Sequence, residues 1–116
     1  MKQKILKVAF DVDDTLLIPG VVTGNRDIPN YKTISLFKWF KEQGADMIVW
    51  SGSGLDWAKT WAEKLGLEAR IIRKGSENVD IAFDDCDLDL GNVNVNVKVK
   101  RVKNQISRKE WNKTKK

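Results

Sequence analysis

Two aspartates, Asp11 and Asp13, stand two positions apart directly after the mostly apolar residues 4 to 10. A carboxylate can act as a nucleophile, as a general acid or base, or as a ligand of a hard metal ion. A second acidic pair, Asp84-Asp85, also follows an apolar segment. The chain has no histidine and a single cysteine, which excludes histidine-based triads, internal disulfides and the usual zinc sites. The chemistry left is that of carboxylates, lysines, hydroxyls and oxygen-bound Mg²⁺.

Strands and helices that alternate along the chain must position these groups. Short apolar segments predict five strands, at residues 4–10, 45–50, 69–72, 80–83 and 93–99. In the last of these Val alternates with Asn or Lys, which is typical of an edge strand with one wet face. Apolar stripes predict helices from a cap at Asn30 to about Gln43 and over 55–65. We therefore expect parallel strands with right-handed crossovers.

The segment between the first strand and the first helix differs from both in composition. Residues 15 to 30 contain both prolines and two glycines, which flank Val21-Val22. This pattern favours a small hairpin or flap.

Polar groups follow the successive predicted strands. Ligands of an open parallel sheet lie outside the carboxyl ends of its strands. The groups expected at this rim are Asp11 and Asp13, Ser51, Arg73-Lys74 and Asp84-Asp85. Carboxylates crowded together repel one another unless a cation neutralises them, and Mg²⁺ prefers such an oxygen site. A lysine and a hydroxyl beside the ion would suit a phosphoryl group.

The segment Asp11-Val12-Asp13-Asp14-Thr15 resembles the DxDxT motif of the haloacid dehalogenase-like (HAD) phosphatases. Ser51, Lys74 and Asp84-Asp85 occur in the order of that family's second, third and fourth motifs, so the resemblance spans about residues 5 to 99. It implies a Rossmann-like sheet of five strands in the order 5-4-1-2-3.

The resemblance also implies a role for each motif residue. Asp11 would attack phosphorus and become an aspartyl-phosphate, and Asp13 would protonate the leaving alcohol and then activate water. Ser51 and Lys74 would complete the catalytic set. Asp14, Thr15 and Gly52 would contact the substrate. The Mg²⁺ ligands would be Asp11, Asp13 through its carbonyl, Asp84 and Asp85, with one member of the last pair binding through water.

Two features depart from the family pattern. Only Gly75 to Val79 separate Lys74 from the fourth strand, where the family usually has a helix. A nearly straight link of that length just spans the distance, so either Lys74 or Arg73 is the expected phosphate-site cation. Because this link holds no helix, we also expect one face of the sheet to be thinly covered. Neither insertion point holds a cap domain, and we therefore expect an open site of the capless type.

Structural interpretations compete with several of these assignments. Ser51 could simply cap a helix, and Lys74 could be a surface charge. A calcium loop beginning at Asp11 would need Gly and Glu where the chain has Leu16 and Val22.

The chain has five tryptophans. Trp50 and Trp61 lie at positions that the apolar patterns predict to be buried. Trp39 lies outside the apolar stripe of its helix, so we expect it to be exposed. Trp57 is expected near the rim, where it could stack on a base, although packing is the preferred interpretation. Trp111 could pin the end of the chain to the body.

The length of 116 residues predicts one domain, with a phosphatase core over 1–103 and a basic tail over 104–116. Residues 92 to 116 carry nine Lys or Arg and one Glu, a net charge of +8, whereas the rest of the chain is acidic at −3. No segment is apolar enough to span a bilayer, and no secretory leader is recognised, so we expect a cytoplasmic protein without a membrane partner.

The expected function is a Mg²⁺-dependent phosphomonoesterase. An uncapped site and a basic tail favour a phosphate on a nucleotide or nucleic-acid end, as in the polynucleotide 3′-phosphatases. A generic small-molecule phosphatase or 5′-nucleotidase fits the same motifs. The alternative of another class is a non-catalytic nucleic-acid-binding module with a vestigial site. The sequence does not indicate an oligomeric state.

Overall fold

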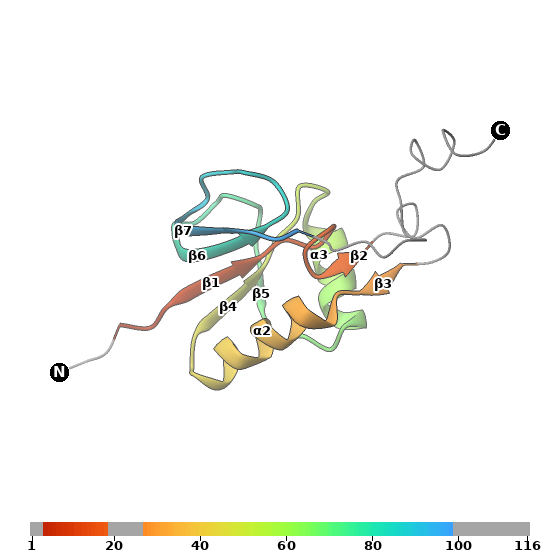
Figure 1. The fold of residues 1–116 in the computed structure, drawn as a ribbon, viewed down its shortest axis with the longest axis horizontal. Helices are drawn as coiled ribbons and strands as arrows, with labels where there is room; N and C mark the ends of the chain where they lie inside the picture. The colour runs from red at the N-terminus through yellow and green to blue at the C-terminus, as the bar shows by residue number, and fades with distance from the viewer. Residues whose placement is uncertain (1–3, 19–26, 99–116) are drawn as a thin grey trace.

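The computed structural model describes residues 4–18 and 27–98. Within them, five parallel strands form one sheet in the order β5-β4-β1-β6-β7 (Figure 1). These strands are β1 Lys7–Phe10, β4 Asp46–Val49, β5 Arg70–Ile71, β6 Val79–Asp84 and β7 Gly91–Asn96. Helix α2 (Tyr31–Glu42) joins β1 to β4, and helix α3 (Leu55–Lys64) joins β4 to β5. The predicted α/β class with a parallel, broadly Rossmann-like sheet is confirmed.

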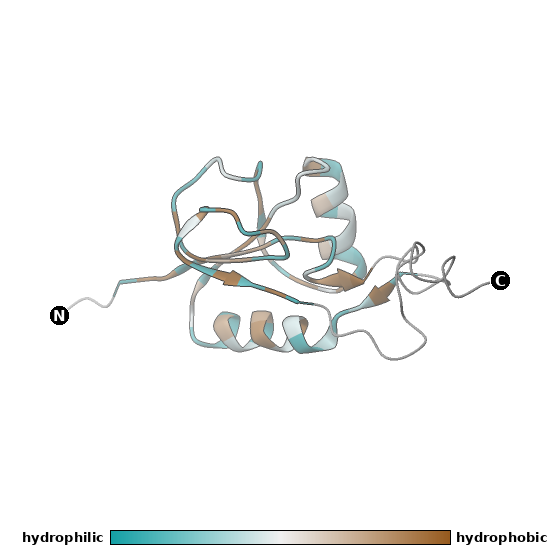
Figure 2. Cartoon of the chain, turned by 45° about the horizontal axis from the view of Figure 1, so that its top comes forward, coloured by the Kyte–Doolittle hydropathy of each residue, from teal (hydrophilic) through white to brown (hydrophobic). Residues whose placement is uncertain are grey.

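The strand numbers differ from the 5-4-1-2-3 that the resemblance implies. Two short strands, β2 Leu17–Ile18 and β3 Ile28–Pro29, take numbers along the chain but form a separate antiparallel pair. In both orders the first strand is central, and here β1 lies between β4 and β6. The β2-β3 pair belongs to the predicted hairpin, and β2 carries the hydrophobic colour in Figure 2. The described residues contain no cap domain.

The two faces of the sheet are covered differently. Alternate residues of β1 enter different clusters, with Val8 and Phe10 in one and Ala9 in the other, as expected of a strand buried on both faces. The first cluster includes Phe37 of α2 and Ala58 of α3, so both helices cover that face. Loops rather than helices cover the second face, where those joining β5 to β6 and β6 to β7 run back above the sheet (Figure 1). One face therefore lacks helical cover among the described residues, as the short link after Lys74 predicts.

Asn30 occupies the N-cap position of α2, but its side chain makes no capping hydrogen bond, so this part of the prediction is wrong. Its amide Nδ2 donates instead to the carbonyl of Thr15 at 3.0 Å, and its backbone N–H donates to the carbonyl of Leu16 at 2.8 Å. The residue thus ties the start of α2 to the segment after β1.

Several predicted elements have different limits in the structure. Strand β5 has two residues where the sequence predicts four, and β7 begins two residues before the predicted strand. β7 is an edge strand as predicted, and most of its residues are exposed. The tip of the flap, the end of the predicted last strand, the basic tail and Trp111 lie outside the described residues. No helix in the described part of the chain is long and apolar enough to cross a membrane.

Candidate active site

The parallel register brings the ends of three strands together. Phe10 at the end of β1 pairs with Val49 on one side and with Phe83 on the other. Beyond this register, Asp11 donates its backbone N–H to the Phe83 carbonyl at 3.0 Å, and Trp50 donates to the Phe10 carbonyl at 3.1 Å. The residues that follow each strand are therefore neighbours at one rim, as sheet geometry requires.

At this rim a lysine lies between two buried aspartates. The Nζ of Lys74 is 3.4 Å from Oδ1 of Asp11 and 2.6 Å from Oδ2 of Asp84. The aspartate side chains are only 7% and 5% exposed, and that of Lys74 is 18% exposed. Three segments that lie far apart in the sequence thus place charged groups in direct contact. We call Asp11, Lys74, Asp84 and the adjacent Asp85 the acidic site.

Lys74 reaches the acidic site because a tight turn follows β5. The N–H of Ser76 donates to the carbonyl of Arg73 at 3.0 Å, and Gly75 has φ 78°, a conformation that strains other residues. The chain then runs directly into β6 without a helix. Of the two cations considered from the sequence, Lys74 is the one that contacts the aspartates.

Burial and mutual repulsion dominate the electrostatics of the acidic site. Burial, with the charge of Asp84 added, raises the pKa of Asp11 to about 7 although Lys74 opposes the shift. Burial and the proximity of Asp84 likewise raise the pKa of Asp85. Burial lowers the pKa of Lys74, but hydrogen bonding to Asp84 and the charges of both aspartates outweigh it and raise that pKa overall. The acidic site thus holds three carboxylates for one ammonium, and the crowding disfavours the charged forms of Asp11 and Asp85.

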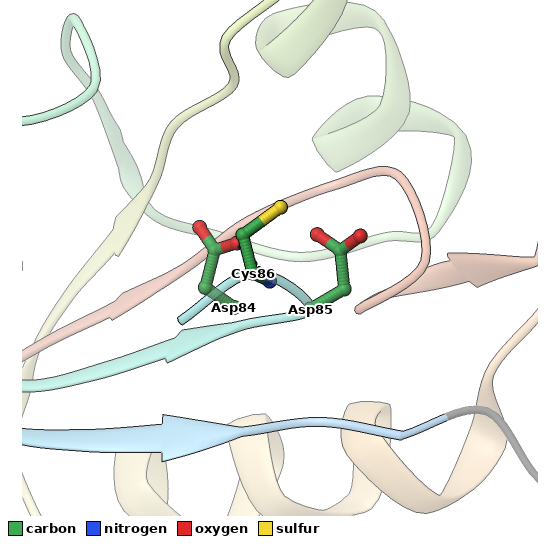
Figure 3. A group of neighbouring side chains, drawn as sticks. All are labelled: Asp84, Asp85 and Cys86. Atoms are coloured by element: carbon green, nitrogen blue, oxygen red, sulfur yellow. Dashed lines mark hydrogen bonds between the residues drawn. The ribbon is translucent and has the colours of Figure 1, made fainter. Parts of the chain in front are cut away.

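The end of β6 and the turn after it present Asp84, Asp85 and Cys86 on the same side (Figure 3). One ligand atom from each lies within 4.8 Å of the others. The backbone N–H of Cys86 donates to Oδ1 of Asp84 at 2.9 Å. The other oxygen, Oδ2, is buried and lies 2.6 Å from Nζ of Lys74, its ion-pair partner.

These donors fit a hard divalent cation. The carboxylates of Asp11, Asp84 and Asp85 are oxygen ligands of the kind that Mg²⁺ prefers, whereas the Cys86 thiol is a soft ligand. Nearby acidic groups raise the pKa of this exposed thiol, with Asp85 the largest cause, which disfavours the thiolate form. Asp84 Oδ2 is a buried acceptor whose partner is the ammonium of Lys74.

The other residues of the first motif form a tight turn. Asp14 has φ 61°, and its N–H donates to the Leu17 carbonyl at 2.7 Å. Thr15 is fully buried, and its hydroxyl has no hydrogen-bond partner. Its side chain therefore packs inside the turn rather than facing the open rim. Oδ1 of Asp13 accepts a hydrogen bond from Nε1 of Trp57 at 3.3 Å.

The turn between β4 and α3 forms one wall of an open hollow beside the acidic site. Residues 51–56, Arg73 and Lys74 line this hollow, which has a volume of about 540 Å³. Ser51 is buried, and its Oγ accepts the N–H of Ser53 at 3.0 Å, while Gly52 is exposed. The structure thus places Ser51, Gly52 and Lys74 around one space next to Asp11.

The contact between Trp57 and Asp13 is the feature of this region that the sequence did not specify. The position of Trp57 in the first turn of the helix predicts its place near the rim, but not its partner. Comparisons of the chain with family models, with curated proteins and with solved structures found no match.

Proposed function

We propose that this protein is a Mg²⁺-dependent phosphomonoesterase of the HAD type without a cap, acting through an aspartyl-phosphate. The observation that carries the proposal is the contact of Lys74 with both Asp11 and Asp84 at the carboxyl edge of a parallel sheet. Excess carboxylate charge around a single ammonium suits a site that also takes a divalent cation. The open hollow beside it can admit a phosphate ester.

The chain's own residues can carry out both steps. An oxygen of Asp11 attacks phosphorus, the bond from phosphorus to the leaving oxygen breaks, and Asp13 gives its proton to that oxygen. Asp13 then takes a proton from water as the water oxygen attacks phosphorus. The bond between phosphorus and Asp11 breaks, which releases inorganic phosphate and restores the carboxylate.

Lys74 and the loop residues hold the phosphoryl group in this scheme. The ammonium of Lys74 offsets charge on Asp11 and on the phosphoryl oxygens, while Gly52 offers a backbone N–H from the wall of the hollow. Asp84 and Asp85, with Asp11 and the Asp13 carbonyl, would hold Mg²⁺. Bound there, the ion would neutralise the carboxylates and withdraw charge from a phosphoryl oxygen.

The direct test is release of p-nitrophenol from p-nitrophenyl phosphate with and without Mg²⁺. We expect turnover that needs Mg²⁺ and that Asp11→Asn abolishes, because the amide is a poor nucleophile. The variant should unfold at or above the wild-type temperature without Mg²⁺, because it removes one of three crowded carboxylates. Turnover by Asp11→Asn close to that of the wild type would refute the assigned nucleophile. A wild type that binds DNA but hydrolyses no ester would favour the non-catalytic alternative.

The substrate class that we propose is a terminal phosphate on a nucleotide or nucleic acid. A groove of about 400 Å³ between α2, β6 and β7 supports this proposal. Lys32 and Lys98 line it beside Tyr31, whose ring is exposed, and it includes Phe83, the residue before Asp84. Cations and an exposed aromatic ring next to the catalytic rim suit a polyanion with bases. A small-molecule phosphatase or 5′-nucleotidase remains the second candidate, since the hollow beside the acidic site is open.

Deletion of residues 104–116 tests the role of the basic tail. We expect the truncated chain to hydrolyse p-nitrophenyl phosphate at the wild-type rate and to bind oligonucleotides more weakly, with a reduced salt dependence. Fluorescence anisotropy with 3′- and 5′-phosphorylated oligonucleotides at two salt concentrations would measure this. Unchanged oligonucleotide binding at low salt would show that the tail does not contribute to it. A preference for mononucleotides in a substrate panel would favour the second candidate.

A further inference from the structure

Trp57 makes a contact that neither the motifs nor the core explains. It is the third residue of α3, whose first turn lies at the rim, and 37% of its surface is exposed. Its indole Nε1 donates to Oδ1 of Asp13 at 3.3 Å, across 44 positions of the sequence. The buried residues of this helix are Ala58 and Ala62, so Trp57 is not part of its core face.

The indole ring is held in place by a neighbour on the same helix. Trp61 packs one turn further along, with its ring centroid 6.0 Å from that of Trp57 in an edge-to-face arrangement. Nζ of Lys64 in turn lies 4.8 Å from the centroid of Trp61. Edge-to-face packing restricts how far the Trp57 ring can turn, and hence where its N–H points. The donor is therefore oriented before any substrate binds.

We propose that Trp57 is the positioning residue of Asp13, an assignment that rests on the proposed function. An indole N–H can only donate, so Oδ1 of Asp13 must act as the acceptor. Oδ2 is then the oxygen that is left to face the leaving group. Trp57 thereby selects which oxygen of Asp13 delivers the proton to the leaving group and later takes one from water.

The consequence is a dependence on the leaving group. An alkoxide is a strong base and needs a proton as the bond to phosphorus breaks, whereas p-nitrophenolate leaves with little help. The parameter kcat/KM reports the first step, transfer of the phosphoryl group to Asp11, and excludes later hydrolysis of the aspartyl-phosphate. Loss of the Trp57 donor should therefore lower kcat/KM for alkyl phosphates and leave that for p-nitrophenyl phosphate almost unchanged.

The experiment compares Trp57→Phe, which keeps an aromatic ring but loses the N–H, with the matched control Trp39→Phe on the exposed side of α2. For glycerol phosphate we expect Trp57→Phe to lower kcat/KM about tenfold, and for p-nitrophenyl phosphate less than about twofold. Trp39→Phe should leave kcat/KM for both esters unchanged. Trp57→His, which can restore an N–H, should recover part of the loss with the alkyl ester.

A double-mutant cycle separates positioning from packing. In the Asp13→Asn background Trp57→Phe should have no further effect on glycerol phosphate, because the two residues act as one unit. An additional tenfold loss there, an equal loss with both esters, or no loss with either would each overturn the proposal. A wild type that hydrolyses neither ester would instead refute the proposed function, which distinguishes the two failures. Thermal unfolding of each variant checks that the fold is retained.

Discussion

The two ends of the sheet both gather charged side chains, but they balance them differently. At the amino ends of the strands, three acidic residues face three cations. We call this group the amino-end network, and its members are Lys4, Lys7, Asp46, Arg70, Glu77 and Asp80. At the carboxyl ends, the acidic site has three carboxylates for one ammonium. The amino-end network is neutral, whereas the acidic site is not.

In the amino-end network, cations paired with carboxylates lower the carboxylate pKa values, and Arg70 has the largest part in this. Its guanidinium donates to both oxygens of Asp46, at 2.9 and 2.7 Å, and to both of Glu77, at 2.9 Å each. Hydrogen bonding to Arg70 lowers the pKa of Asp46. It also lowers the pKa of Glu77, to about 2. Hydrogen bonds from Lys4 and from the backbone of Lys7 lower the pKa of Asp80.

In the acidic site the shifts have the opposite direction, because burial and like charges raise the pKa values of Asp11 and Asp85. A fold selected only for stability would gain by pairing or removing these carboxylates. Their position at the carboxyl edge of the sheet is the one that the proposed Mg²⁺ site requires. The comparison thus separates charges that hold the fold from charges that the proposed chemistry needs.

Replacing Lys74 should produce the largest difference between the two ends. We expect Lys74→Met to lower kcat/KM for p-nitrophenyl phosphate by roughly a hundredfold to a thousandfold, because it removes a charge that stabilises the transferring phosphoryl group. It should also cost about 2 kcal/mol of stability without Mg²⁺, since the charges of Asp11 and Asp84 lose their counter-ion. Urea unfolding and steady-state kinetics measure the two effects.

The matched control is Arg70→Met, which removes a cation from the amino-end network. It should leave kcat/KM unchanged. Comparable losses of activity from both variants would mean that Lys74 acts on the fold and not on the substrate.

Addition of Mg²⁺ should affect the acidic site alone. At ten times its dissociation constant, the ion should raise the free energy of unfolding of the wild type by about 1.4 kcal/mol. Asp85→Asn should reduce that gain by weakening binding, and without Mg²⁺ it should cost no stability, because Asp85 is a crowded carboxylate. Asp80→Asn at the other end should respond to Mg²⁺ as the wild type does. Equal thermal shifts for all three chains would place the cation elsewhere.

Acid should lower the stability of the folded protein mainly through the amino-end network. We expect this effect to be smaller than those of Lys74→Met and of Mg²⁺. Carboxylates whose pKa is lowered in the folded protein stabilise it above their unfolded pKa of about 4, and this contribution is lost as the pH falls toward 2. Stability should therefore decrease over that interval. In Arg70→Met the decrease should be shallower, because the pKa values of Asp46 and Glu77 move back toward normal. Thermal midpoints at pH 2 to 5 test this, and parallel curves for the two chains would contradict it.

The main features of the fold and the acidic residues of the site could be predicted from the sequence. Asp11 and Asp84 directly follow strongly apolar strands, and parallel pairing then requires that such residues meet at one rim. The choice of Lys74 over Arg73 depends on the turn at Gly75, which the spacing alone leaves open.

Other contacts depend on tertiary placement that local patterns do not encode. The Asn30 side chain could either accept a hydrogen bond from the helix N–H groups or donate one to a nearby carbonyl. The position of the Thr15 carbonyl favours the second. The partner of Trp57 depends on how α3 is oriented against the segment after β1. The amino-end network joins residues of four strands with Lys4 before β1 and Glu77 in the loop before β6, and no motif in the sequence predicts it.

The most direct test of the proposed chemistry is to trap the phosphorylated protein. Borohydride reduces an aspartyl-phosphate to homoserine, which peptide mass spectrometry can locate. After incubation with Mg²⁺ and p-nitrophenyl phosphate, we predict homoserine at position 11, and none when Mg²⁺ or the ester is omitted. Active protein that yields no homoserine, or homoserine at position 13 or 85, would contradict the assignment of Asp11 as nucleophile.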